Sequence, residues 1–320
     1  MERTPTASLR RGDLIADLSR RVVARQWREM DANRSGTIED SEPERLHDLR
    51  VATRRVRFAL RLFAPWLGPG AAALRRELRW IALCLGGVRD LDVFAERLRG
   101  DPGGLAAGQT ALGILLAHVD GWRAARLAML RRALLSTRWE HLTAGLAVLG
   151  RDEITAIARG GVATVAEIAP IMVCDAARRV ARRGVRALTS GRAVDLHTVR
   201  IAFKGLRYTT EFVAPAYGTP ARQAIHAMIA FQDCLGAHHD AIVARRRLFW
   251  LRREITARAA GRGIALVETL LEHARHDAEA RRGEFVALWP GWRQLRAGLD
   301  AALGHDEIAS PRDACRTRIR

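Results

Sequence analysis

LHDLRVATRRVRFALRLFAPWLG, residues 46–68, is the stretch that decides the fold. Its cationic side chains recur at steps of three and four, which at about 100° per residue places them on one face of a helix. Apolar residues occupy a separate face at the same spacing. The cationic positions are His47, Arg50, Arg54, Arg57 and Arg61, and the apolar ones are Leu49, Ala52, Val56, Leu60 and Phe63. The stretch therefore predicts a helix with one core face and one strongly basic face.

The same pattern returns 150 positions later, as LHTVRIAFKGLRYTTEFVAPAYG at residues 196–218. The two stretches align without a gap. The basic positions of the second are His197, Arg200, Lys204 and Arg207. Three further patterns recur in the same order, D-x-x-R-R-V at 17–22 and 175–180, C-L-G-x-x-x-D at 84–90 and 234–240, and W-x-x-L-x-A-G-L at 139–146 and 292–299. We infer a tandem duplication of a domain-sized unit.

Composition points to an all-α fold. Hydrophobic residues make up 48% of the 320 residues, Ala, Leu and Arg dominate, and Tyr and Phe are few. We predict two tandem antiparallel helical bundles. Their expected bounds are a tail at 1–9, a first bundle at 10–150, a second at 160–304 and a basic tail at 305–320.

Within the first half, the expected helices cover residues 7–30, 43–65, 71–85, 90–99, 105–135 and 138–149. Residues 31–44 are predicted to form a loop, and Gly86-Gly87 to end the helix before them. Asp90 and Asp240, the last residues of the repeated C-L-G-x-x-x-D pattern, are expected to begin helices or to pair with arginines.

The net charge of +18 indicates an anionic partner. Lys204 is the only lysine, and arginine is the better bidentate ligand for phosphate oxygens. The chain has no signal-peptide run and no apolar stretch long enough to span a membrane, and its four cysteines form no C-x-x-C pair. We therefore expect a cytoplasmic protein without membrane insertion. Its oligomeric state stays open.

A charged helix face is most often a solvated surface with ion pairs. Here the basic faces have few carboxylates at helical spacing, and a second arginine row precedes each of them. These rows are Arg21, Arg25 and Arg28 in the first half, and Arg179, Arg183 and Arg186 in the second. The pattern favours a polyanion-binding site.

The ligand is expected to be recognised through phosphate. The basic faces carry no Asn or Gln to read bases, and only Phe58 and Tyr208 lie near them as stacking groups. Neither a phosphate loop nor a nucleophile elbow occurs, so we expect no catalytic residues and no cofactor. Metal binding is also not expected, because Glu44-x-x-His47 has Val194 where its repeat should carry the glutamate, and His238-His239-Asp240 shares only the aspartate with Val88-Arg89-Asp90.

The duplicated LHxxRxAxRxxR(F/Y) helix and the duplicated C-L-G-x-x-x-D pattern resemble the CHAD family, a histidine-containing α-helical domain that binds inorganic polyphosphate. The resemblance covers residues 10–305. It implies two bundles related by a pseudo-two-fold axis, a basic cavity or pore between them, and association of bacterial members with polyphosphate granules. The family's basic surface falls on the two His-bearing helices, with the earlier arginine rows as a second tier.

The chain departs from the family pattern at two points. Arg61 has Glu211 as its counterpart, which marks the expected end of the site and makes the first half the more positive one. Many relatives carry a triphosphate-tunnel domain with an E-x-E-x-K signature, and neither the signature nor room for the domain is found here. The resemblance thus implies non-enzymatic polyphosphate binding. A non-specific nucleic-acid-binding architectural protein and a metal-dependent polyphosphate phosphatase or phosphotransferase stay open as alternatives.

Overall fold

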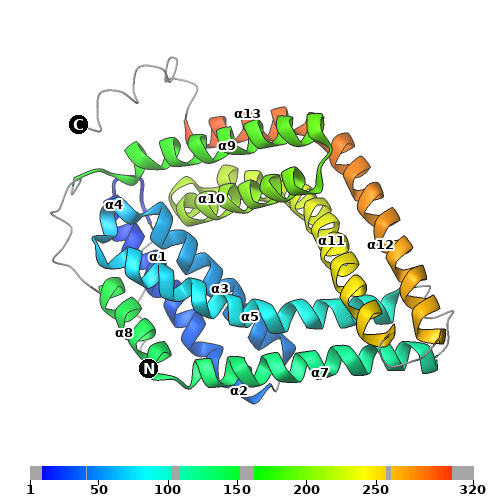
Figure 1. Ribbon diagram of the computed structural model, residues 1–320. Coiled ribbons are helices and arrows are strands. Elements are labelled where there is room, and N and C mark those ends of the chain that lie inside the picture. The colour runs from blue at the N-terminus through cyan, green and yellow to red at the C-terminus, as the bar shows by residue number, and fades with distance from the viewer. Residues whose placement is uncertain (1–8, 41, 102–108, 152–161, 257–260, 305–320) are drawn as a thin grey trace. The chain divides into compact units, whose positions relative to one another are not determined.

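The computed structural model describes residues 9–40, 42–101, 109–151, 162–256 and 261–304, and these ranges contain helices and no strand (Figure 1). The all-α prediction is therefore confirmed for them. The helices in the first half are α1 Ile15–Ala32, α2 Arg34–Glu39, α3 Pro43–Leu62, α4 Ala64–Leu67, α5 Gly70–Gly100, α7 Gln109–Leu134 and α8 Thr137–Arg151. Those in the second half are α9 Val165–Ser190, α10 Ala193–Ala227, α11 Ile229–Thr256, α12 Gly261–Leu288, the 3₁₀ helix η2 Trp289–Gly291 and α13 Trp292–Leu303. The expected tails at 1–9 and 305–320 fall, except for Leu9, outside the described residues.

The chain divides into two compact units, each assembled from separate segments. The α3 unit comprises Ala16–Gly161 and Ala237–Arg281, and the α10 unit comprises Met1–Ile15, Val162–Gly236 and Arg282–Arg320. Residues 237–281 belong to the second half of the sequence but pack with the first. The units therefore have other bounds than the bundles at 10–150 and 160–304 that the repeat predicts.

An apolar core explains why α11 and α12 join the α3 unit. The C-terminal half of α5 and the N-terminal half of α7 lie beside them (Figure 1). Leu115, Val119, Leu251 and Val267 of this core are fully buried. Burying a Leu or Val side chain contributes about 1.5–3 kcal/mol, so four helices that share such a core form a bundle of their own.

The α10 unit is held by α9, α10 and α13. Phe203 of α10 stacks on Phe231 with ring centroids 4.8 Å apart, and Trp292 of α13 meets Phe203 edge-on at 5.6 Å. The chain before α1 pairs with the start of α9, since the Val165 amide donates to the Asp13 carbonyl at 2.9 Å. The described residues before α1 thus belong structurally with the second half of the chain.

Three predicted boundaries in the first half are wrong. The first helix, expected from residue 7, begins at Ile15. Residues 34–39, expected in a loop, form α2, and α5 continues through Gly86-Gly87 to Gly100. A Cβ added at Gly86 would meet nothing within 4 Å, and neither of these glycines adopts positive φ. Leu85 and Val88, which flank the glycines, are fully buried, and this burial outweighs the cost of about 1 kcal/mol that each glycine imposes in a helix.

Some matched positions of the repeat have the same local structure. Gly68 and Gly218 both have positive φ, 75° and 67°; Gly68 follows the end of α4, and Gly218 lies at a kink within α10. Trp139 and Trp292 are both buried. The duplication itself remains a prediction. In the part of the chain that the structure describes, no helix is long and apolar enough to cross a bilayer.

Candidate functional site

The basic face of α3 arises because the opposite face is buried. Pro43 at the first helical turn begins the helix, and Leu46, Leu49, Ala52, Val56 and Leu60 pack into the core. The cationic residues lie on the remaining surface. His47, Arg57 and Arg61 are exposed, while Arg50 and Arg54 are half-buried. Arg61 also lies over the Phe58 ring, 5.0 Å from its centroid.

Arg50 makes a specific contact with α5. Its Nη2 lies 3.3 Å from Asp90 Oδ1, and the other carboxylate oxygen of Asp90 lies 3.8 Å from Nη2 of Arg247 on α11. The expectation that Asp90 pairs with arginine is confirmed. The alternative that Asp90 begins a helix is wrong, because Asp90 lies within α5.

Cations crowd one another on this surface. Burial and the charges of Arg79 and Arg75 lower the pKa of Arg57. Burial and the charge of Arg89, with further contributions from Arg50 and Arg54, lower the pKa of His47. Each added positive charge therefore has a free-energy cost here, and an anion would relieve it.

The crowding also identifies residues outside the predicted site. Arg75, Arg79 and Arg89 of α5 act on the α3 cations, as does Arg247 of α11 on Asp90. In the alignment of the two halves, Arg75 and Arg79 correspond to apolar residues. The repeat pattern therefore did not include these two arginines in the predicted site. Arg247 has no signal in the repeat pattern, because only folding brings α11 to α5.

The basic face of α10 is organised in the same way. Val199, Phe203 and Leu206 are buried, and the basic residues lie on the other side, each half-buried. The four basic residues are His197, Arg200, Lys204 and Arg207. Burial and the charges of Arg200 and Lys204 lower the pKa of His197.

At the C-terminal end of this face Arg207 is engaged by neighbours. Its Nε donates to Glu211 at 2.5 Å and its Nη1 to the Gln232 side chain at 2.9 Å. Glu211 is thus one of the few carboxylates at helical spacing on these faces, whereas the partner of Arg50, Asp90, comes from another helix.

The second-tier arginines have mixed roles. Arg21, Arg25 and Arg28 of α1 are exposed, and Arg25 pairs with Glu29 at 3.1 Å. On α9, Arg179 is exposed. Arg183 and Arg186 instead bind the start of α10, where Arg183 donates to the Thr198 carbonyl at 3.2 Å and Arg186 to Asp195 at 2.9 Å. These two contacts give both residues a structural role in joining α9 to α10.

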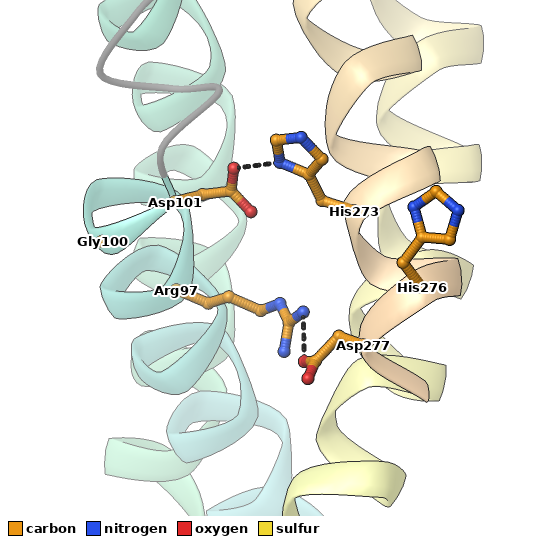
Figure 2. Close-up of a pocket in the computed structure, with 6 residues that line it drawn as sticks. All are labelled: Arg97, Gly100, Asp101, His273, His276 and Asp277. Carbon is orange, nitrogen blue, oxygen red and sulfur yellow. Dashed lines mark hydrogen bonds and ion pairs between the residues drawn. The ribbon is translucent and has the colours of Figure 1, made fainter. Parts of the chain in front are cut away.

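A separate pocket lies in the α3 unit where α5 ends beside α12 (Figure 2). Asp101 accepts a hydrogen bond from His273 Nδ1 at 2.7 Å in the tautomer that carries the proton on this nitrogen, and Arg97 donates to Asp277 at 2.8 Å. Both pairs join α5 to α12 across the pocket. Over the described ranges, no group of three or more His, Cys, Asp or Glu side chains is arranged to hold a metal ion.

Fold and site together define an all-α protein whose helices carry cationic faces headed by histidines. The family model described as the CHAD domain matches residues 21–249, and the chain belongs to this family. The resemblance noted in the sequence is thereby confirmed.

Relatives and solved structures agree with the assignment. The uncharacterized proteins MT2285 and Rv2226, from two strains of Mycobacterium tuberculosis, are each 29% identical over 250 residues, which is 76% of this chain and 47% of theirs. The chain thus spans about half the length of the curated relatives it matches. Among solved structures, the CHAD domain from the plant Ricinus communis is 26% identical with a TM-score of 0.68, covering 94% of this chain and 96% of the other. PptA from Streptomyces chartreusis shares the fold, with a TM-score of 0.61 at 19% identity over 86% of this chain and 99% of that one.

Proposed function

We propose that this protein binds inorganic polyphosphate, without catalysis, through the basic faces of α3 and α10. The observation that carries the proposal is the gathering of cations at matched positions on the two faces, where burial and the neighbouring positive charges together lower the pKa of His47 on α3 and of His197 on α10. Crowded cations on a folded surface are stabilised by a ligand of high negative charge density. Polyphosphate, with one charge or more on each phosphate, is such a ligand.

The spacing of the basic residues suits a linear chain of phosphates. Successive cations along each helix are three or four residues apart, which is about one turn or 5.4 Å. Each arginine can give two parallel hydrogen bonds to one phosphate. A polymer lying along α3 would thus meet Arg50, Arg54 and Arg57 in turn. Recognition by charge and spacing needs no base-reading group, in agreement with the absence of Asn and Gln from these faces.

A paired substitution tests the assignment. Arg50→Ala with Arg200→Ala removes one arginine from each face, and we expect the Kd for polyphosphate to rise about 100-fold or more, because hydrogen bonds to charged groups are worth about 1.5–3 kcal/mol each and at least one is lost at each position. The matched control is Arg132→Ala with Arg293→Ala, which removes the same charge from exposed positions on α7 and α13. Its Kd should stay within about threefold of the wild type. Equal losses in the two variants, measured by isothermal titration calorimetry, would reject these faces as the site.

Salt dependence and competition separate the alternatives. Binding to several phosphates makes log K fall linearly with log salt concentration, with a slope of about −0.7 to −0.9 per contact for nucleic acids. We expect a steep slope for polyphosphate, shallower in the Arg50/Arg200 variant. If duplex DNA displaces polyphosphate at equal phosphate concentration and physiological salt, the protein is a nucleic-acid binder instead.

The absence of catalysis is tested directly. Polyphosphate incubated with the protein and added Mg²⁺ or Mn²⁺ should release no phosphate above the rate without protein. Release that the Arg50/Arg200 variant abolishes would establish a phosphatase or phosphotransferase. Granule association is the expected cellular consequence of binding. A fluorescent fusion should colocalise with granules in cells that accumulate polyphosphate, and the same substitutions should disperse it.

A further inference from the structure

Three helices of the α3 unit direct charged side chains at one carboxylate. Asp90 comes from α5, Arg50 from α3 and Arg247 from α11. Each arginine approaches a different oxygen of Asp90, at 3.3 Å for Arg50 and 3.8 Å for Arg247. The carboxylate therefore lies between two guanidinium groups that are almost 200 residues apart in sequence.

Without this carboxylate, keeping the two guanidinium groups partly buried and charged would cost free energy. The side chain of Arg50 is 32% exposed and that of Arg247 only 20%, so each has lost much of its hydration. Further cations surround them. Arg54 and Arg89 act on Arg50, and Arg126 acts on Arg247. Asp90 opposes these effects for both arginines, and Asp240 adds a second, weaker opposing charge at Arg50.

The contacts leave most of the donors on the two arginines available. A guanidinium has five N–H donors. Asp90 contacts a single terminal nitrogen of each arginine, at long distance, and makes no bidentate pair of hydrogen bonds with either. Nη1 of Arg247 is buried, and no hydrogen-bond acceptor among the described residues reaches it. A buried donor of this kind gains the full value of a hydrogen bond when an acceptor arrives.

We propose that Arg247 is a further phosphate-binding residue of the basic face on α3, and that Asp90 is a positioning residue which holds Arg50 and Arg247 as a pair. This inference rests on the proposed function and extends it to α11. Asp90 keeps two cations close enough to grip adjacent phosphates, while consuming few of their donors. The ligand then meets a pair that is already assembled, so less side-chain entropy is lost on binding.

A positioning role for Asp90 and a simple effect of its charge predict opposite changes in the affinity for polyphosphate when Asp90 is replaced by Asn. Asp90→Asn removes a negative charge from a cationic surface, and charge alone predicts tighter binding of a polyanion. If Asp90 positions the arginines, they repel each other and separate in the variant, and binding weakens. We expect the Kd for polyphosphate to rise about fivefold although the net charge of the protein increases by one.

The control is Asp48→Asn, an exposed carboxylate on the same helix as Arg50. It makes the same change in charge without touching the pair, so the Kd should be unchanged or fall by up to about twofold. Arg247→Gln should raise the Kd by about tenfold. Asp90→Asn and Arg247→Gln together should raise it less than the product of the single effects, because both disrupt one arrangement.

The slope of log K against log salt concentration reports the number of phosphate contacts, so it distinguishes the loss of one contact from a general destabilisation of the fold. It should become shallower by about one phosphate contact in Arg247→Gln and in Asp90→Asn, and stay the same in Asp48→Asn. Thermal unfolding of each variant checks that it is folded. If Asp90→Asn does not fold, Arg247→Gln, whose side chain remains long and polar, decides the part of the proposal that concerns Arg247. Asp90→Glu then decides the part that concerns positioning, since it retains the charge but displaces it, and should weaken binding.

Distinct results overturn distinct claims. Tighter binding by Asp90→Asn, matching that of Asp48→Asn, rejects positioning and leaves polyphosphate binding intact. Wild-type affinity in Arg247→Gln removes α11 from the site. A wild-type protein that does not bind polyphosphate at low salt overturns the proposed function itself.

Discussion

Arg123 holds Asp40 through two parallel hydrogen bonds of 2.8 Å, one from each terminal nitrogen to each carboxylate oxygen. Its Nε also donates to Asp92 of α5 at 2.6 Å. One side chain of α7 thus joins the end of α2 to α5. Asp40 has a left-handed backbone, with φ of 58°, which few residues other than glycine adopt without support. The ion pair stabilises this conformation of Asp40 at the end of α2.

Arg123→Met should therefore destabilise the protein by about 2 kcal/mol, because it leaves two partly buried carboxylates without their donor. Urea unfolding followed by circular dichroism measures the change. Arg132→Met, on the exposed side of the same helix, is the control and should stay within about 0.5 kcal/mol of the wild type. Equal effects of the two substitutions would show that the Asp40 contact contributes nothing.

The same contact predicts a pH dependence of stability. The hydrogen bond and charge of Arg123 lower the pKa of Asp40 below its ordinary value of 3.8. A lowered carboxyl pKa means that the unfolded state binds the proton first, so the stabilisation is complete above pH 3.8 and is lost as the pH falls below it. The difference in unfolding free energy between wild type and Arg123→Met should shrink in acid. A constant difference down to the acid transition would contradict this account.

Polyphosphate binding should tighten as the pH falls. Burial and neighbouring cations lower the pKa of His47 and His197 below 6.5 in the free protein. A bound polyanion favours the imidazolium, so it raises both pKa values and binding takes up protons. Affinity should be constant at high pH and increase as the pH falls through the pKa of the complex. Calorimetry in buffers of different ionisation enthalpy measures the proton uptake, and His47→Gln with His197→Gln should abolish most of it.

Gly184 of α9 is expected to tolerate no side chain. A Cβ at this position would lie 1.7 Å from the Trp289 ring, which itself stacks on Trp292 at 5.9 Å. Gly184→Ala should therefore cost about 3 kcal/mol through overpacking. Gly298→Ala is the matched control on α13, where nothing lies within 4 Å. That variant should gain about 0.5–1 kcal/mol from helix propensity. A neutral Gly184→Ala would mean that Trp289 can move aside at little cost.

The four-helix core of the α3 unit gives a further prediction. Leu251 is fully buried among α5, α7, α11 and α12, and Leu251→Ala should lower the unfolding free energy by about 3 kcal/mol. Leu83, 69% exposed on α5, is the control, and its replacement by Ala should change stability by less than about 0.5 kcal/mol. Hydrogen exchange of α11 and α12 should accelerate together with that of α5 and α7. Acceleration confined to α11 would argue against a shared core.

The helices that carry the basic faces were predictable because their signal is local. Period-3.6 alternation in 46–68 and 196–218 places Leu49 and Val199 inward and Arg50 and Arg200 at the surface, as found. Such periodicity depends only on helix geometry, so it needs no knowledge of distant contacts.

The failures share a different cause. Residues 34–39 look like a loop because α2 is too short to have a periodic pattern, and it is held by α7, where Arg131 donates to the Ile38 carbonyl at 2.7 Å. Gly86-Gly87 looks like a helix end because glycine has a low helix propensity, while the burial of Leu85 and Val88 on either side of the glycines keeps α5 continuous. Arg247 could not be assigned because its relation to Asp90 exists only in the folded α3 unit. Each miss concerns a contact between segments distant in sequence.

The assembly of the α3 unit from separate segments has a consequence for biosynthesis. The apolar surfaces of α5 and α7 leave the ribosome early, but the α11 and α12 segments that cover them are translated more than 100 residues later. At about 5–20 residues per second, those surfaces wait on the order of ten seconds before their partners exist. The nascent chain therefore exposes a binding surface for chaperones during this interval. A fragment that stops near residue 150 would keep the surface exposed permanently, so aggregation is its expected fate.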